Sequence, residues 1–274
     1  MTAPPAFEIH PGNSPIVLAI PHTGDHIPAE ILTRLTDIGH QRNDTDWHIH
    51  RLYDGLLPDA TVIRALFHRY VIDPNRDPAG GALYANRKES SLCPLYTFDG
   101  QPLYLENLEP DNEEVVQRTH RYHRPYHAAI EQALQRALQS HGIAILYDCH
   151  SVRSVIPTLF NGKLPDLNIG TVDGSSCSPQ LEEVVYRLCD RCPDYSVVLN
   201  GVFRGGWTTR HHGQPDAGIH AIQMELSQSI YMLEQPPWTM DNLRSQNLRS
   251  LLKKVLHELE QAAHTLATRP TYVK

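Results

Sequence analysis

The sequence predicts a single α/β domain over residues 1–274, built on a mixed, mostly parallel sheet with helices on both faces. Two observations lead to this prediction: short continuous apolar runs recur along the chain, and long segments of helical periodicity lie between them. Continuous apolar runs are typical of strands that are buried on both faces, and strands that alternate with helices favour an α/β fold. The 274 residues suffice for one large domain or two small ones, and no low-complexity linker divides them.

Six apolar runs are predicted as strands because each is short and rich in β-branched residues. They lie at residues 15–20, 60–65, 67–73, 143–149, 195–200 and 219–226. The segment 74–112 has little regular pattern and many Pro, Gly, Asn and Asp residues. A segment of this length in a compact domain is typically functional or a cover over a site.

Three segments have apolar residues at helical spacing. The first covers about residues 112–141, where Pro125 should kink or divide the helix and Gly142 follows as a stop signal. The second begins at Ser178, a candidate N-cap residue that is followed by Pro. The third covers about residues 241–267. These helices supply the predicted cover of the sheet.

Composition narrows the class of protein. The chain has 24 Lys and Arg residues against 31 Asp and Glu residues, a net charge of −7, which argues against a nucleic-acid partner. No apolar run approaches the roughly 18 residues that a transmembrane helix needs, and the first residues lack the pattern of a signal peptide. Five cysteines do not form a disulfide framework in a chain of this length. We therefore expect a cytoplasmic protein without a membrane partner.

Two histidines follow predicted strands. His22 comes just after the strand at 15–20, and His150 directly follows the strand at 143–149. Ligands of α/β proteins bind beyond the carboxyl ends of the strands, and catalytic zinc commonly uses three protein ligands with one open position. Either histidine alone could instead be a hydrogen-bonded structural residue. The segment 43–50 offers candidates for a third ligand, namely Asp44, Asp46, His48 and His50.

The strand predicted at 67–73 runs into a possible anion site. Arg76 can bind a carboxylate through two parallel hydrogen bonds, and the Asn75 amide can add a third. Arg69 is a second cation close by. Taken alone, Asp73 and Asn75 could simply form a turn.

Two further features indicate chemistry on charged substrates. Glu225 lies late in the apolar run at 219–226, where an ionised carboxylate is costly to bury unless it is paired or used. It could be the general base beside a metal, or an exposed residue at a strand end. The segment 203–213 contains two glycines and two cations, Arg204 and Arg210, which could meet a second carboxylate.

These residues belong to motifs that resemble the N-formylglutamate amidohydrolase (N-formylglutamate deformylase) family. The motifs occur in order along nearly the whole chain, and the long one at 156–171 favours the deformylase itself over a remote relative. They lie at 21–24, 44–48, 69–76, 92–94, 97–104, 118–127, 147–151, 156–171, 203–213 and 222–226, with Tyr231 and Met232 after the last.

The resemblance implies a fold like that of zinc carboxypeptidases, also described as phosphorylase/hydrolase-like, and it suggests residue roles. His150 would be a zinc ligand, and Glu225 would be the catalytic base. Asn75 and Arg76 would hold the α-carboxylate of the substrate. Arg69 would be a catalytic residue that polarises the scissile carbonyl.

The third metal ligand is the point at which the sequence departs from the carboxypeptidase pattern. That pattern begins with His-x-x-Glu, whereas His22 is followed three residues later by Asp25. Asp46 is the first choice for the ligand because its Asp-Thr-Asp-Trp segment belongs to the family pattern. Asp25 and Asp44 are the alternatives.

The activity that the resemblance implies is hydrolysis of N-formyl-L-glutamate to formate and L-glutamate, a step of histidine degradation. It would use one divalent metal ion, with Zn²⁺ the first choice. The substrate is a small dianion, so Arg210, with Arg204 second, would bind its γ-carboxylate. A related zinc amidohydrolase of another N-acyl amino acid is the main alternative, and a non-catalytic binder of an acidic metabolite is another. The role of His127 and the oligomeric state are left open.

Overall fold

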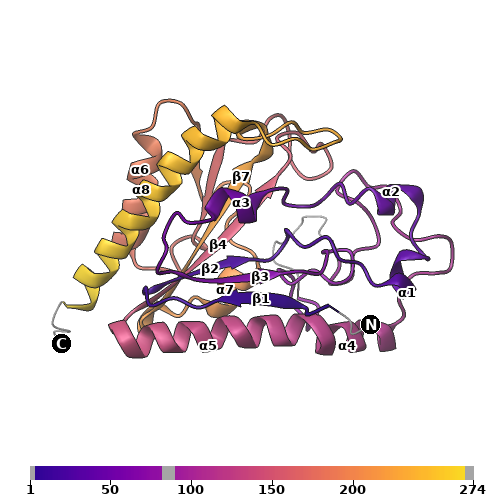
Figure 1. The fold of residues 1–274 in the computed structure, drawn as a ribbon, viewed down its shortest axis with the longest axis horizontal. Coiled ribbons are helices and arrows are strands. Elements are labelled where there is room, and N and C mark those ends of the chain that lie inside the picture. The colour runs from indigo at the N-terminus through magenta and orange to yellow at the C-terminus, as the bar shows by residue number, and fades with distance from the viewer. Residues whose placement is uncertain (1–3, 82–89, 269–274) are drawn as a thin grey trace.

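In the part of the chain that the structure describes, the sheet has seven strands in the order β1-β3-β2-β4-β7-β5-β6 (Figure 1). The computed structural model describes residues 4–81 and 90–268. The strands are β1 (Phe7–His10), β2 (Ile16–Ile20), β3 (Thr61–Ala65), β4 (Ala144–Val152), β5 (Leu167–Gly170), β6 (Val197–Leu199) and β7 (Ile219–Ser227).

Strand directions make this a mixed sheet with a parallel centre. Neighbours β3, β2, β4 and β7 run parallel, and β5 and β6 run parallel to each other. β1 pairs antiparallel with β3, and β5 pairs antiparallel with β7. The predicted α/β class, with a mostly parallel sheet, is confirmed. The parallel centre brings the carboxyl ends of β2, β4 and β7 to one edge.

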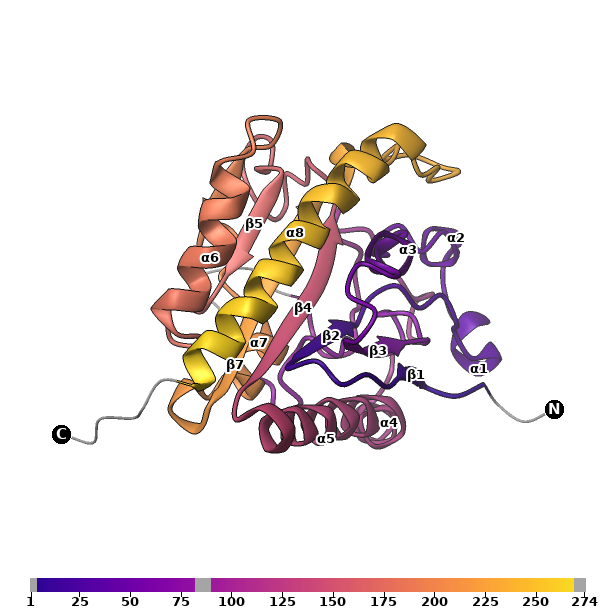
Figure 2. The same cartoon turned by 60° about the vertical axis from the view of Figure 1, so that its left-hand side comes forward.

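Helices cover both faces of this sheet. The long ones are α5 (Arg124–His141), α6 (Pro179–Asp190) and α8 (Asn242–Ala267). Figure 2 shows α6 and α8 beside each other on one face, with α5 on the other. Alternate residues of β4 divide between the two cores: Ile145 and Tyr147 pack with α6 and α8, whereas Ala144 and Leu146 pack with α5. This alternation determines which side chains of β4 reach the α5 face.

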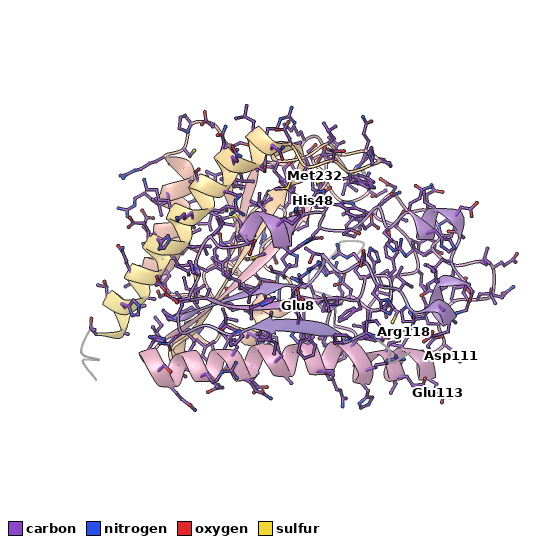
Figure 3. All side chains as sticks on the ribbon, in the orientation of Figure 1. Glu8, His48, Asp111, Glu113, Arg118 and Met232 are labelled. Carbon is purple, nitrogen blue, oxygen red and sulfur yellow. The ribbon has the colours of Figure 1, made fainter. Side chains whose placement is uncertain are left out.

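Local signals explain where the helices begin and end. The side chain of Ser178 accepts the Leu181 amide at the start of α6, and Gly142 adopts a φ of 72° at the end of α5. Asp111, labelled in Figure 3 at the start of α4, accepts the Glu114 amide. The remaining helices are α1 (Ala29–Leu32), α2 (Asp37–His40), α3 (Ile49–Tyr53), α4 (Asn112–Arg118), α7 (Trp207–His212), the π-helical turn η1 (Thr119–His123) and the 3₁₀ turns η2 (Pro215–Ala217) and η3 (Gln228–Ile230).

The segment predicted as a strand at 67–73 is a turn, so this prediction is wrong. Phe67 forms only an isolated bridge with His26, and the Val71 amide donates to the His68 carbonyl. Its apolar residues reflect the burial of the turn itself, because Phe67, Tyr70, Val71 and Ile72 belong to the core of the α5 face. The sequence also missed the short strands β1 and β5, which are each four residues long.

The predicted helix at 112–141 is interrupted, as Pro125 indicated, but the irregular part lies before the proline. The π-helical turn η1 separates α4 from α5, which begins at Arg124. None of the helices in the described ranges 4–81 and 90–268 combines the length and the apolar content needed to cross a bilayer.

Candidate active site

The candidate site lies where β2, β4 and β7 end. His22 follows β2 by two residues, and β7 carries Glu225. His150 lies within β4, which continues to Val152, rather than after the strand as predicted. Parallel pairing places His150 directly beside Glu225. Residues that are paired in register point to the same face of a sheet, so these two side chains share the α5 face.

Three potential metal ligands converge there. The Nδ1 atoms of His22 and His150 are 3.2 Å apart, and Asp46 Oδ2 is 3.2 Å from His150 Nδ1 and 3.7 Å from His22 Nδ1. Zinc–ligand bonds of about 2.0–2.2 Å in tetrahedral geometry separate the ligand atoms by about 3.3–3.5 Å. All three residues are buried. Their spacing therefore fits one divalent ion.

The outward nitrogens of both histidines lie beside carboxylates. His22 Nε2 lies 2.7 Å from Asp73 Oδ1, and His150 Nε2 lies 3.1 Å from Asp148 Oδ1. Asp73 accepts the proton of His22 Nε2, so His22 Nδ1 keeps its lone pair for the centre of the group. His150 Nε2 is paired with Asp148 and also lies 3.2 Å from Asn75 Nδ2. Metal-binding histidines commonly have this arrangement. The donor set thus fits a metal in its outer contacts as well as in its spacing.

Negative charge also accumulates around this point. Burial opposes ionisation of Asp46, yet His22, His150 and Arg69 lower its pKa. Burial likewise opposes protonation of His150, but Asp148, Asp46 and Glu225 raise its pKa. A buried group of this charge is stabilised by a bound cation.

The other candidate ligands do not join the group. Asp44 Oδ2 accepts the Tyr70 hydroxyl at 2.8 Å and the Phe98 amide at 2.9 Å, and Asp25 is exposed. The two histidines of the segment 43–50 also point away from the group. His48 Nε2 contacts the Trp238 carbonyl, and His50 lines a separate groove beside β1. The geometry favours Asp46 among the alternatives.

Arg69 reaches the same centre. Its Nη2 lies 2.9 Å from His22 Nδ1 and 3.1 Å from Asp73 Oδ2, and its Nη1 lies 3.4 Å from Asp46 Oδ1. The Phe98 ring covers the guanidinium at 4.8 Å. Arg69 is therefore a fixed positive group next to the potential ligands.

A pocket opens on this group and includes the predicted anion clamp. Asn75, Arg76 and Glu225 line it together with the three potential ligands. Arg76 Nε donates to the carbonyl and hydroxyl oxygens of Ser90 at 3.2 and 3.1 Å. Much of the remaining wall is apolar and comprises Phe98, Val152, Leu159, Val202 and Phe203.

The two arginines predicted for the second carboxylate lie elsewhere. Among the residues of the described chain that line the pocket, neither Arg204 nor Arg210 is present. Arg204 is half-exposed and pairs with Asp173 at 3.2 Å. Arg210 Nε donates to the Gly205 carbonyl at 3.1 Å.

Comparison with known proteins settles the family. A family model described as N-formylglutamate amidohydrolase matches residues 14–232. A Pseudomonas putida protein named N-formylglutamate deformylase is 41% identical over 254 residues, which cover 92% of this chain and 95% of that protein. The chain belongs to the N-formylglutamate amidohydrolase family. The resemblance inferred from the sequence motifs is confirmed.

Further comparisons agree with this family or with its fold. A Pseudomonas aeruginosa protein, also named N-formylglutamate deformylase, is 39% identical over 90% of this chain and 93% of its own. The crystal structure of N-formylglutamate amidohydrolase from Ralstonia eutropha JMP134 matches with a TM-score of 0.74 at 25% identity, covering 96% of this chain and 97% of that one. A structure from Agrobacterium tumefaciens, at 17% identity and a TM-score of 0.70 over 97% of each chain, shares the fold.

Sequence reasoning missed two residues of the site in this N-formylglutamate amidohydrolase family member. Asp148 backs His150, and Gln223 Nε2 donates to Glu225 Oε2 at 3.3 Å while its Oε1 accepts the Gly206 amide at 2.7 Å. Each lies two residues before the residue it supports. The period of two along a strand places such pairs on one face, and this signal could have found both.

Proposed function

We propose that this protein hydrolyses the formyl amide of N-formyl-L-glutamate to formate and L-glutamate with the help of one divalent metal ion, Zn²⁺ being the first choice. The observation that carries the proposal is the convergence of His22, Asp46 and His150 beside Glu225, in a pocket that Asn75 and Arg76 also line. The names of the relatives support the substrate. From the sequence we also propose histidine degradation as the pathway and the cytoplasm as the location.

The metal would be held by His22 Nδ1, His150 Nδ1 and an oxygen of Asp46. Three protein ligands with an open position are typical of catalytic zinc, in contrast to closed structural sites. When bound, zinc would act as a Lewis acid that polarises a carbonyl and makes water more acidic. Asp73 would keep the imidazole of His22 in the tautomer that binds a metal, and Asp148 would pair with His150 from the outer side.

Glu225 is the proposed general base. Burial raises its pKa to about 8, with His150 opposing this shift and Asp46 reinforcing it. A pKa near the working pH suits a group that must both accept and return a proton. The Glu225 carboxylate takes a proton from a water molecule as the oxygen of that water attacks the formyl carbon. Glu225 then gives that proton to the amine nitrogen as the C–N bond breaks.

Arg69 is proposed to stabilise negative charge that develops during the reaction, and the Asn75–Arg76 pair is proposed to bind the negative charge of the substrate. The buried guanidinium of Arg69 would stabilise the oxyanion that develops on the formyl oxygen, which is usually a large part of catalysis. Asn75 and Arg76 would bind the α-carboxylate. For the γ-carboxylate, Arg210 and then Arg204 were expected, but neither lines the described pocket, so we limit the proposal to the α-carboxylate.

The deciding experiment measures formate release from N-formyl-L-glutamate by the purified protein as isolated, after chelation, and after zinc is restored. We expect turnover that chelation removes and zinc restores, with about one metal ion per chain by elemental analysis. A panel of N-acetylglutamate, N-formylaspartate and N-formylleucine tests the related amidohydrolase. Absence of formate release from the zinc-loaded protein would contradict the substrate assignment, and turnover that survives complete metal removal would contradict the metal.

A further inference from the structure

Two buried histidines hold the backbone of the proposed carboxylate clamp from behind. His127 Nε2, on α5, lies 2.7 Å from the Pro74 carbonyl oxygen, and His123 Nε2, at the end of η1, lies 3.0 Å from the Arg76 carbonyl oxygen. These carbonyls flank Asn75 on both sides. Neither histidine is among the described residues that line the pocket. Their contacts are with the loop and not with the space where substrate would bind.

The hydrogen-bond partners determine the tautomers of both rings. A carbonyl oxygen can only accept, so His123 and His127 must each carry a proton on Nε2. His127 Nδ1 is then an acceptor, and His212 Nε2 lies 3.1 Å from it and can donate. Burial lowers the pKa of His127 and of His123, so both rings are neutral donors. A directed chain of hydrogen bonds thus runs from α7 through His127 to Pro74.

The side chain of Asn75 is held from the same direction. Its Oδ1 accepts the Thr208 amide of α7 at 2.9 Å, and its backbone amide donates to Asp73 Oδ1 at 2.8 Å. Trp207, the first residue of α7, packs against both histidines, with ring centroids 4.5 Å from His127 and 5.0 Å from His123. The clamp loop therefore lies against a packed wall made by α5, η1 and α7.

The π-helical turn η1 positions one of the two histidines that contact the clamp backbone. His123 is the last residue of the π-helical turn, and His127 lies four residues later on the same face of the helix. Their rings are 4.5 Å apart, tilted by 39°. Single π-helical turns inside α-helices are frequent at functional sites. Here the turn ends at a residue that contacts the backbone of the clamp.

We propose that His127, together with His123, is a positioning residue for recognition of the substrate α-carboxylate. The two Nε2 donors fix the backbone on either side of Asn75, so that the Asn75 amide and the Arg76 guanidinium face the carboxylate at a set distance. This inference rests on the proposed function, and it adds the residues that determine the geometry of its clamp. Neither histidine touches the reacting atoms.

The test compares His127→Leu, which removes the donor, with His127→Gln, whose amide nitrogen can replace Nε2. His120→Leu is the matched control, because His120 is exposed on the same π-helical turn. For His127→Leu we expect the KM for N-formyl-L-glutamate to rise at least tenfold, with kcat changed less than threefold and metal content unchanged. His127→Gln should recover most of the loss, and His120→Leu should match the wild type.

A substrate without the α-carboxylate separates positioning from a general structural role. For 4-(formylamino)butanoate, kcat/KM should be the same in the wild type and in His127→Leu, because the clamp has no group to bind. Binding of L-glutamate by calorimetry should weaken about tenfold in His127→Leu. Equal losses on both substrates, or unchanged glutamate binding, would overturn the proposal. If His127→Leu does not fold, the same comparisons on His123→Leu decide it, since loss of the second donor must then make the variant discriminate the two substrates less than the wild type does.

Failure of this inference is distinct from failure of the proposed function. If the zinc-loaded wild type releases no formate from N-formyl-L-glutamate, the proposed function fails before any variant is considered. If the wild type is active and His127→Leu keeps its KM and its affinity for glutamate, the positioning role alone is wrong.

Discussion

The candidate site has two halves that are built in different ways. His22, His150 and the base lie on or just beyond paired strands, where register fixes His150 beside Glu225. The third potential ligand, Asp46, reaches them from the loop before α3. The carboxylate clamp at Asn75 and Arg76 lies on a turn with no ladder of its own. It depends on the side chains of His127 on α5 and His123 on η1 and on the Thr208 amide of α7. The comparison teaches that a sheet edge can position reactive groups by backbone pairing, whereas a binding loop needs support from outside.

Replacement of the base should give the largest effect in the strand-built half. Glu225→Gln keeps the shape and the contact with Gln223 but cannot accept a proton. Loss of a general base typically costs about 10² to 10⁴ in rate, so kcat should fall by that amount. Metal content and KM should remain near the wild-type values, as elemental analysis and initial rates would show. Turnover close to wild type would remove Glu225 from the mechanism.

Replacement of Asp148, the carboxylate beside His150 on β4, should show how much a neighbour on the same strand contributes to metal binding. Asp148→Asn removes the charge that holds His150 Nε2 at 3.1 Å, and loss of such an outer partner typically lowers metal affinity about 10- to 100-fold. Competition with a chromogenic chelator measures this affinity. Asp166→Asn is the control, because the Asp166 carboxylate, directly before β5, accepts hydrogen bonds from Ser196 and not from a potential metal ligand. An unchanged zinc affinity in Asp148→Asn would show that the strand partner has no such role.

A substitution in the clamp half of the site should change KM rather than kcat. Arg76→Lys keeps the positive charge but loses the planar fork that binds a carboxylate through two hydrogen bonds. The Nε donor to Ser90 is lost as well. We expect KM for N-formyl-L-glutamate to rise about tenfold, since such charged hydrogen bonds are worth about 1.5–3 kcal/mol. A KM equal to that of the wild type would show that Arg76 does not hold the substrate.

The same contrast explains what the sequence could predict. Apolar runs that end in polar residues mark the edge of a parallel sheet, and this pattern located His22, His150 and Glu225 without any knowledge of contacts. The spacing of two residues would also have located Asp148 and Gln223. The strand half of the site is therefore largely contained in local patterns.

The clamp half could be found only in part. Asn75 and Arg76 stand out as residue types, but their run at 67–73 was predicted as a strand because a buried turn and a buried strand have the same apolar composition. The supports of the loop have no local signal, since His127 binds Pro74 across 53 residues and His212 across 85. Contacts of that kind depend on how α5 and α7 pack, which no periodicity specifies.

The buried histidines behind the clamp predict that the stability of the protein depends on pH. Burial, together with His211 and His123, lowers the pKa of His212 to about 3, whereas an unfolded histidine titrates near 6.5. Below about pH 6.5 the unfolded chain therefore binds a proton that the folded chain does not. The free energy of unfolding should fall as pH decreases from about 6.5 towards 3, by up to about 1.4 kcal/mol per pH unit for this residue.

The dependence can be assigned to His212 by substitution. His212→Gln can keep a donor towards His127 but cannot titrate, so its free energy of unfolding should fall less steeply between pH 6.5 and 5 than that of the wild type. Chemical denaturation at several pH values measures the slope, and His40→Gln, at an exposed position of α2, should keep the wild-type slope. Equal slopes for the wild type and His212→Gln would mean that His212 binds a proton in the folded chain as readily as in the unfolded chain. The packed wall of α5, η1 and α7 would then not exclude charge from behind the clamp, contrary to this prediction.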